Sequence, residues 1–233
     1  QVGRGDAMIP NTRATVQEIF DGLVAQSQNH LGPLDRDLMA INDLLWPFLA
    51  TGFYYKTFMW PRSFWEKLYE PVIRRAAGLG RMTRAPEPQH HEKAFAFCDV
   101  LVIGGGPAGL MAALTAAQGG ADVIVVEETA AFGGRLLSDS QKIDGADASF
   151  WVEDMLKALD ATGRVRRMAR TTVTGAYDDG SYGALERVAR HLPPAPDLPP
   201  ECFWRIRARQ AVLAAGAHER PIAFPMNDRP GIM

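Results

Sequence analysis

Residues 98–135 read as an apolar strand, a glycine-rich turn, a helix and a second apolar strand that ends in an acid. The text is CDVLVIGGGPAGLMAALTAAQGGADVIVVEETAAFGGR, in which Gly104, Gly106 and Gly109 have the spacing G-x-G-x-x-G. In this motif the first glycine permits a tight turn and the second lets a pyrophosphate approach the backbone. The third allows the helix to pack closely against the strand. The segment therefore predicts a βαβ unit with a dinucleotide-binding turn.

Two further features give this reading the context that a short glycine motif needs. Pro107 stands in the first turn of the expected helix, whose N-terminal end and free N–H groups suit phosphates. Glu127 follows the second apolar run, about 20 residues after Gly104, where a carboxylate can accept hydrogen bonds from a ribose. A plain βαβ unit with a tight turn and no ligand is the alternative.

The composition excludes several other classes of protein. The chain has 233 residues, 47% hydrophobic and 22% charged, with a net charge of −2, so neither a nucleic acid nor a membrane is an expected partner. Cys98 and Cys202 are far apart, which predicts no disulfide framework and a cytoplasmic protein. The adjacent His90 and His91 lie in a polar linker without metal-ligand spacing, so no metal site is predicted.

The N-terminal part, residues 1–93, is predicted to be mostly helical. Apolar residues recur at helical spacing over residues 14–29, 38–48 and 65–76, and APEPQHHEK at 85–93 is typical of a linker. The aromatic run at 51–61 favours packing in a core or at a subunit interface over contact with a ligand.

Residues 94–233 are predicted to form the dinucleotide-binding domain. A helix is expected over 148–162, followed by strands at 171–178, 182–189 and 202–208 and by a buried strand within 211–221 that returns to the sheet. This order predicts an α/β fold, a doubly wound parallel Rossmann-like sheet with a small antiparallel β layer.

Several motifs together resemble those of known families. GGGPAG, the strand-end acid, GGR and VLAAGAHERP are similar to the two-dinucleotide-binding flavoprotein superfamily, although Ala214-Ala215-Gly216 replaces its usual Ala-Thr-Gly. The flanking GFYYKTFMWP, RTTVTGAYD and VLAAGAHERPIAFPMNDRPGIM resemble the alpha subunits of heterotetrameric sarcosine oxidases. Opine and proline dehydrogenase subunits are related alternatives. The resemblance covers only an early part of a longer polypeptide, so the second domain is expected to be incomplete at its C-terminus.

The resemblance implies a role within a larger complex. In that family the alpha subunit binds NAD in this region, after a ferredoxin-like domain whose end would be residues 1–93. FAD and FMN lie with the beta subunit, gamma and delta subunits complete the assembly, and tetrahydrofolate binds further along alpha. The complex converts sarcosine to glycine, passing the one-carbon unit to tetrahydrofolate or releasing formaldehyde, with electrons going to oxygen. The chain would then bind NAD, or alternatively FAD, and carry no catalytic residue.

Two other functions remain open at this point. An independent FAD-dependent oxidoreductase is one, and a scaffold that has lost its ligand is the other. A dithiol reductase is excluded, because no cysteine lies between Cys98 and Cys202. The pair Glu127 and Glu128 disfavours the 2′-phosphate of NADP, which would require a nearby arginine.

The resemblance also assigns the expected cofactor contacts. The pyrophosphate should lie against the glycine-rich turn, the adenosine ribose against the end of the second strand, and the adenine against the backbone at Val173. Arg135, after Gly133-Gly134, could donate to a ribose or phosphate, or form a surface ion pair. The full set is Gly104, Gly106, Ala108, Gly109, Glu127, Glu128, Thr129, Gly134, Arg135 and Val173.

Overall fold

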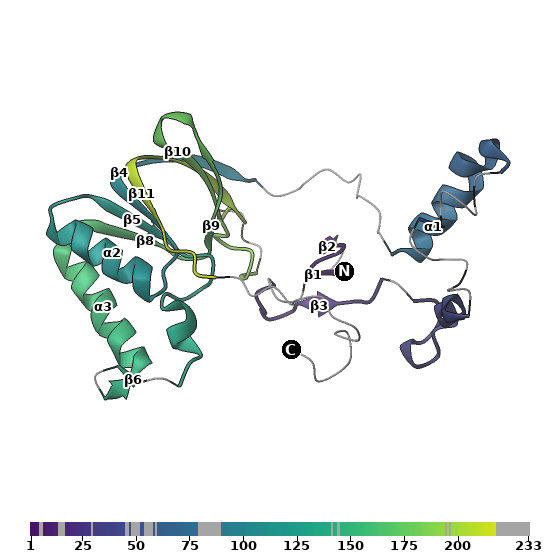
Figure 1. Ribbon diagram of the computed structural model, residues 1–233, viewed down its shortest axis with the longest axis horizontal. Helices are drawn as coiled ribbons and strands as arrows, with labels where there is room; N and C mark the ends of the chain where they lie inside the picture. Colours follow the sequence, from purple (N-terminus) through teal and green to yellow (C-terminus); the bar gives the residue numbers. More distant parts are fainter. Residues whose placement is uncertain are drawn as a thin grey trace. The chain divides into compact units, whose positions relative to one another are not determined.

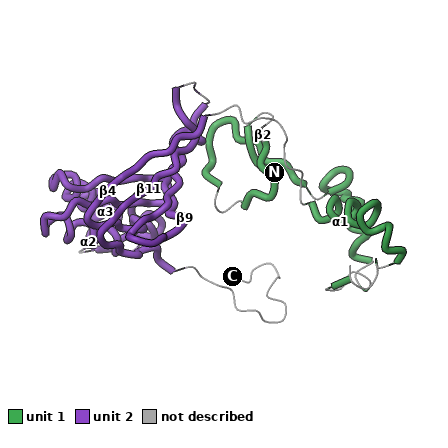
Figure 2. The backbone as a smooth tube through the Cα atoms, turned by 90° about the horizontal axis from the view of Figure 1, so that it is seen from above, with its two compact units in different colours: residues 1–87 green, residues 88–233 purple. Residues whose placement is uncertain are grey.

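The computed structural model divides the chain into two compact units, residues 1–87 and 88–233 (Figure 2). Each unit is described by itself. The structure describes residues 1–4, 7–13, 17–28, 30–44, 47, 52–53, 58, 60–78, 90–140, 142–143, 145–193, 195 and 197–217.

Unit 1 contains a small sheet and several short helices. The strands are β1 (Val2–Arg4), β2 (Ala7–Ile9) and β3 (Val24–Ala25), and β1 pairs antiparallel with both others. The helical segments are 3₁₀ helices at Leu34–Arg36, Leu38–Asp43 and Arg62–Phe64, a π-helix at Trp65–Tyr69 and α1 at Glu70–Ala76.

The helix expected over residues 14–29 is not what the structure shows in the described part, residues 17–28. Gly22 has φ +81°, which ends any right-handed helix at that point. Val24 then pairs with Gly3, and Ala25 with Val2, so these two apolar residues belong to a strand. Tertiary pairing has overridden helical spacing here.

The other two N-terminal predictions are met in part. Residues 38–43 form a 3₁₀ helix, and residues 65–76 are helical, with Pro71 in the first turn of α1. In the aromatic run Phe53 and Phe58 are in edge contact, with ring centroids 5.8 Å apart, whereas Trp60 is exposed. Residues 51, 54–57 and 59 of that run, and most of the linker at 85–93, lie outside the described residues.

Unit 2 is built on one six-stranded sheet with the order β8-β5-β4-β11-β10-β9 (Figure 1). The strands are β4 (Glu92–Ile103), β5 (Val123–Val126), β8 (Val165–Met168), β9 (Thr171–Tyr177), β10 (Ser181–Glu186) and β11 (Cys202–Leu213). β8, β5, β4 and β11 are parallel, and β10 and β9 continue the sheet antiparallel. The predicted α/β fold, a mostly parallel Rossmann-like sheet with an antiparallel layer, is confirmed.

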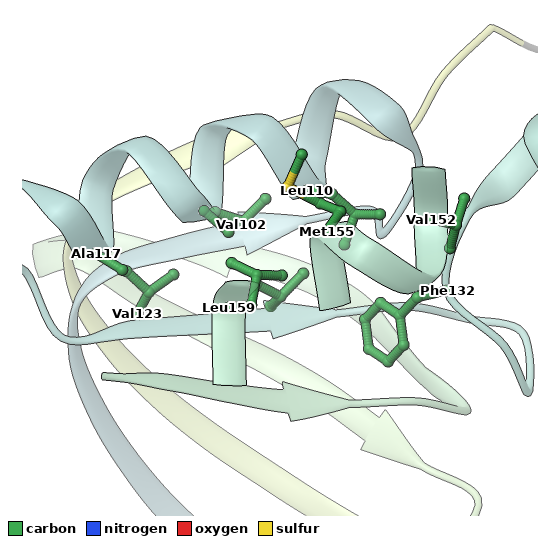
Figure 3. Packing of buried hydrophobic residues seen from close by; sticks show 10 residues of the cluster. Val102, Leu110, Ala117, Val123, Phe132, Val152, Met155 and Leu159 are labelled. Atoms are coloured by element: carbon green, nitrogen blue, oxygen red, sulfur yellow. The ribbon is translucent and has the colours of Figure 1, made fainter. Parts of the chain in front are cut away.

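Two helices cover one face of the parallel strands. α2 (Pro107–Gln118) and α3 (Ala148–Thr162) contact one another alongside the sheet (Figure 1). A 3₁₀ helix at Gly134–Leu137 and the hairpin β6 (Lys142–Ile143) and β7 (Ala146–Asp147) precede α3. The core between helices and sheet is shown in Figure 3 and contains Val102, Leu110, Ala113, Ala117, Val123, Val125, Phe132, Val152, Met155 and Leu159.

The opposite face of the same strands packs against the antiparallel layer. Leu101 and Ile124, the neighbours in sequence of Val102 and Val123, contribute to a second core with Ile206 from β11 and Ala184 from β10. Successive strand residues point to opposite faces, and both faces are covered here. That double burial explains why β4 and β5 read as unbroken apolar runs.

β11 differs from its prediction. The sequence predicts two strands, at 202–208 and within 211–221, the second of them buried; residues 218–221 of that prediction lie outside the described residues. The structure has one strand, because no glycine or proline interrupts Arg209-Gln210. Its first half pairs with β10 and its whole length with β4. Past the stretch that pairs with β10, its residues 209–213 are exposed, and Leu213 is 77% accessible.

Helices long and apolar enough to span a bilayer are absent from the part of the chain that the structure describes.

Candidate dinucleotide-binding site

The turn after β4 is packed so closely that two of its glycines admit no side chain. Gly104 has φ +107°, and a Cβ there would lie 2.3 Å from the carbonyl oxygen of Ala214. A Cβ on Gly109 would lie 1.9 Å from the carbonyl oxygen of Gly104. The close approach of helix, turn and β11 therefore accounts for both glycines without any ligand.

Gly106 is different, because the protein leaves space beside it. A Cβ there would meet nothing nearer than the Cα of Gly134, at 4.0 Å, and the backbone (φ −74°) is open to any residue. Gly106 is the N-cap of α2, which has no side-chain cap, and Pro107 and Ala108 are exposed in the first turn. Open space in front of free helix N–H groups is what a phosphate requires.

A second glycine loop lies against the first. The N–H of Gly133 donates to the carbonyl oxygen of Gly105 over 2.8 Å. Gly134 has φ +54°, and a Cβ on it would come within 3.0 Å of the Cα of Gly106. The predicted Gly-Gly-Arg segment thus borders the open space at the start of α2.

Glu127 stands at the end of β5 and is 7% exposed. Its Oε2 accepts a hydrogen bond from the N–H of Gly105 over 2.8 Å. Its Oε1 accepts two, from the N–H and the hydroxyl of Thr129, each over 2.9 Å. A carboxylate offers about four acceptor positions, so one on Oε2 remains for a ribose hydroxyl. The carboxylate is held in place before any ligand arrives.

The other three predicted residues take part in none of the contacts just described. Glu128 is exposed, and its carbonyl oxygen accepts from the Arg187 guanidinium. Arg135 is exposed, with its Nε 3.7 Å from Asp139 Oδ2, which matches the surface ion pair considered for it. Val173 is half-buried against the second core, where its side chain takes part in packing.

Sequence reasoning missed Arg187 and Gly105. The N–H of Arg187 donates to the carbonyl oxygen of Arg170 over 2.9 Å, and the N–H of Arg170 donates to that of Thr129 over 2.8 Å. The end of β10 is thereby joined to the segment after Glu127. No local pattern marks Arg187, because its partner Glu128 is 59 positions away. Gly105 lies within the motif, but the motif spacing gives it no role.

One histidine of the linker lies beside an acidic residue. His91 Nδ1 is 3.5 Å from Glu201 Oε2. Among the residues with a described placement, no three His, Cys, Asp or Glu side chains come together as metal ligands would.

Known proteins are similar to this chain in sequence. Residues 99–205 match the family described as FAD dependent oxidoreductase. The sarcosine oxidase alpha subunit of Rhizobium meliloti (strain 1021) is 54% identical over 233 residues, which is 100% of this chain and 24% of that protein. The sarcosine oxidase alpha subunit of Corynebacterium sp. (strain P-1) is 43% identical over 159 residues, 67% of this chain and 16% of that protein.

Two similarities are more remote. An opine oxidase subunit of Rhizobium meliloti (strain 1021) is 28% identical over 134 residues, 58% of this chain and 28% of that protein. Among solved structures, L-proline dehydrogenase from P. horikoshii aligns with TM-score 0.47 and 26% identity, over 65% of this chain and 28% of that one.

The chain spans about a quarter or less of the sarcosine oxidase subunits it matches. The resemblance to sarcosine oxidase alpha subunits is confirmed along the whole chain, and residues 99–205 match the FAD dependent oxidoreductase family.

Proposed function

We propose that unit 2 binds an adenine dinucleotide, NAD, at the N-terminal end of α2. The observation that carries this proposal is the open space at Gly106, which packing does not require. The pyrophosphate would lie against Gly104, Gly106, Ala108 and Gly109, with the amides of the first turn of α2 as donors. The nicotinamide of bound NAD would supply hydride chemistry, and no side chain of this chain is assigned a catalytic role.

The adenosine half would be held at the end of β5. Glu127 is already fixed by Gly105 and Thr129, which together use three of its acceptor positions and leave one for the ligand. Fixing a carboxylate in advance reduces the entropy lost on binding. Glu128 would line the ribose from the exposed side, and the backbone at Val173 would face the adenine. Gly134 would keep the second loop close, with Arg135 exchanging Asp139 for a phosphate or ribose oxygen.

At the level of the whole protein, we propose a component of a sarcosine-oxidase-like oxidoreductase. Its support is the 54% identity along the chain. In this proposal beta, gamma and delta subunits are the partners, FAD and FMN lie with beta, and tetrahydrofolate binds elsewhere on the full-length protein. The complex would demethylate sarcosine to glycine in the cytoplasm. Residues 94–233 would be the nucleotide domain and 1–93 the end of a ferredoxin-like domain.

FAD is the second candidate for the bound dinucleotide. One observation favours it, the match of residues 99–205 to the FAD dependent oxidoreductase family. The acceptor at Glu127 suits the ribose of either cofactor, because both carry a 2′-hydroxyl. The isoalloxazine ring of FAD would distinguish the two by its visible absorbance.

The decisive experiment identifies the cofactor released from the purified full-length protein on denaturation. The variant Gly106→Ala tests the site itself, because it should change binding without changing stability much. Its Cβ meets only Gly134 at 4.0 Å, so the free energy of unfolding should change by no more than about 1 kcal/mol. Dinucleotide affinity should fall at least tenfold, because the methyl group occupies the space of the pyrophosphate. Release of FAD alone from this site would refute NAD, and unaltered affinity in the variant would refute the site.

A further inference from the structure

The N-terminal half of β4 has an open backbone edge within the described structure. β4 pairs with β11 along its length, from Glu92 to Ile103. On its other side β5 pairs only with Val100–Ile103. Residues 92–98 therefore present main-chain hydrogen-bonding groups to which the described residues offer no partner strand. An open edge of this length is a template for a further strand.

The outer face beside this edge carries aromatic side chains in solvent. Phe95 and Phe97 are 64% and 75% exposed, and Tyr177 of β9, on the same face, is 64% exposed. Ala96, between the two phenylalanines of β4, and Ala208 of β11, opposite Cys98, are buried in the second core. The alternation is therefore regular, and the phenylalanines occupy positions where polar residues are usual. Grouped exposed aromatics are typical of interaction surfaces.

Arginines occupy the facing positions on the neighbouring strand. Arg205 lies opposite Phe95 and Arg207 opposite Phe97 in the register of β11 with β4. The guanidinium of Arg205 lies over the Phe95 ring, 5.8 Å from its centroid, so the cation reaches toward the open edge. Lys93 adds a third exposed cation. The surface therefore pairs aromatic contact area with positive charge, which suits carboxylates.

A cavity of about 520 Å³ lies where the open edge ends. It is lined by residues of β4, of β11 and of the turns before β5 and β10, and its charged side chains are Asp99, Asp122, Asp179, Arg207 and Arg209. Asp99 is engaged by Arg209, whose Nε lies 3.3 Å from its Oδ1. The cavity gives the end of an added strand room for a side chain.

We propose that residues 92–98 of β4 bind an extended segment of a partner polypeptide by β-strand addition. The segment would pair with the open main chain, place apolar residues against Phe95 and Phe97, and place carboxylates near Arg205, Arg207 and Lys93. Main-chain pairing supplies affinity in such contacts, and the alternating side chains supply specificity. The partner is a separate chain with an acidic and apolar segment. This proposal does not depend on the nucleotide site.

Hydrogen–deuterium exchange on the full-length protein tests the open edge. The amides of residues 92–98 that point away from β11 should exchange rapidly in the isolated protein. They should be at least tenfold slower in the assembled complex. If they are already protected in the isolated protein, another part of the same chain covers the edge and the proposal is wrong.

Peptide binding tests the assigned chemistry. The probes are two nine-residue fluorescent peptides titrated by anisotropy. The side chains of one strand face alternate Val with Glu in one peptide and Val with Lys in the other, and every residue of the opposite face is Ser. The Glu peptide should bind at least tenfold more tightly, and the double variant R205E/R207E should reverse this preference. Equal binding of the two peptides would overturn the charge assignment and with it the proposal.

Two variants separate docking from folding and from self-association. Replacing Phe95 and Phe97 by Ser should reduce Glu-peptide affinity at least tenfold while the thermal unfolding temperature stays unchanged. Phe150→Ser is the matched control, since Phe150 is 58% exposed on α3, and it should bind normally. Light scattering completes the test: dimerisation that the Phe95 and Phe97 replacements remove would assign the edge to a second copy and overturn the partner proposal.

Discussion

The two halves of β4 share one strand and one neighbour, β11, but differ in almost every other respect. Val100–Ile103 have strands on both sides and a core on each face, and Leu101 and Val102 are fully buried. Residues 92–98 have a strand on one side and aromatic side chains in solvent. The glycine-rich turn therefore follows the part of the strand that is paired on both sides and buried. The proposed interaction surface lies on the part with the most open main chain.

The largest loss of stability should come from adding a side chain in the tightly packed glycine-rich turn that follows β4. Gly109→Ala would place a Cβ 1.9 Å from the carbonyl oxygen of Gly104, and backbone cannot yield as a flexible side chain can. We expect a loss of about 3 kcal/mol or more in unfolding free energy, measured by chemical denaturation. A variant with unchanged stability would show that the turn has more freedom than its packing indicates.

Truncation of one side chain in each half tests the comparison directly. Leu101→Ala removes a fully buried side chain from the second core and should cost about 2–5 kcal/mol. Phe97→Ala removes an exposed ring and should change stability by no more than about 0.5 kcal/mol. Denaturation midpoints of both variants provide the measurement. Equal losses would mean that the N-terminal half is covered in the intact protein.

Glu127→Ala should weaken dinucleotide binding by about 1–3 kcal/mol, because the N–H of Gly105 and any ribose hydroxyl lose their acceptor. Isothermal titration with the identified cofactor measures the change. Glu128→Ala is the neighbouring control and, since its side chain is exposed, should have a smaller effect. The reverse order would place the ribose on Glu128.

The smallest expected change in stability concerns Cys98, which lies at the boundary between the two halves of β4. Burial is the main cause that raises the pKa of its thiol to about 11. The folded state then holds the proton more tightly than the unfolded state, whose thiol has a pKa of about 8.5. This contribution to stability is complete below about pH 8 and declines as the pH rises toward about 11.

Alkylation by iodoacetamide at about pH 8, followed by mass spectrometry, measures the thiolate of Cys98. Labelling should be about a hundredfold slower than for a peptide thiol. The Cys98→Ser variant should show a shallower fall of stability above about pH 8.5. Labelling at the rate of a free peptide thiol would show that the boundary between the halves opens readily.

Local sequence predicts the part of the structure that local rules govern. The strand-turn-helix-strand order at 98–127 and the helix at 148–162 follow from glycine spacing and apolar periodicity. Gly104, Gly106 and Gly109 look alike in sequence, yet two serve packing and one leaves space, because that distinction depends on Ala214 and Gly134. Arg187 and the antiparallel pairing of Val24 depend on distant residues in the same way. The exposure of Leu213 also depends on what covers the sheet rather than on its own apolar character.

The pairing of β4 with β11 affects how the chain can be synthesised. Glu92 lies opposite Cys202, so roughly 110 residues must leave the ribosome after β4 before its partner exists. At about 5–20 residues per second, β4 waits for about 5 to 20 seconds. During that time the phenylalanines and both edges of residues 92–98 are open to other nascent chains, because β5 pairs only with Val100–Ile103. We expect a chaperone that recognises extended aromatic segments to bind the nascent chain at this stage.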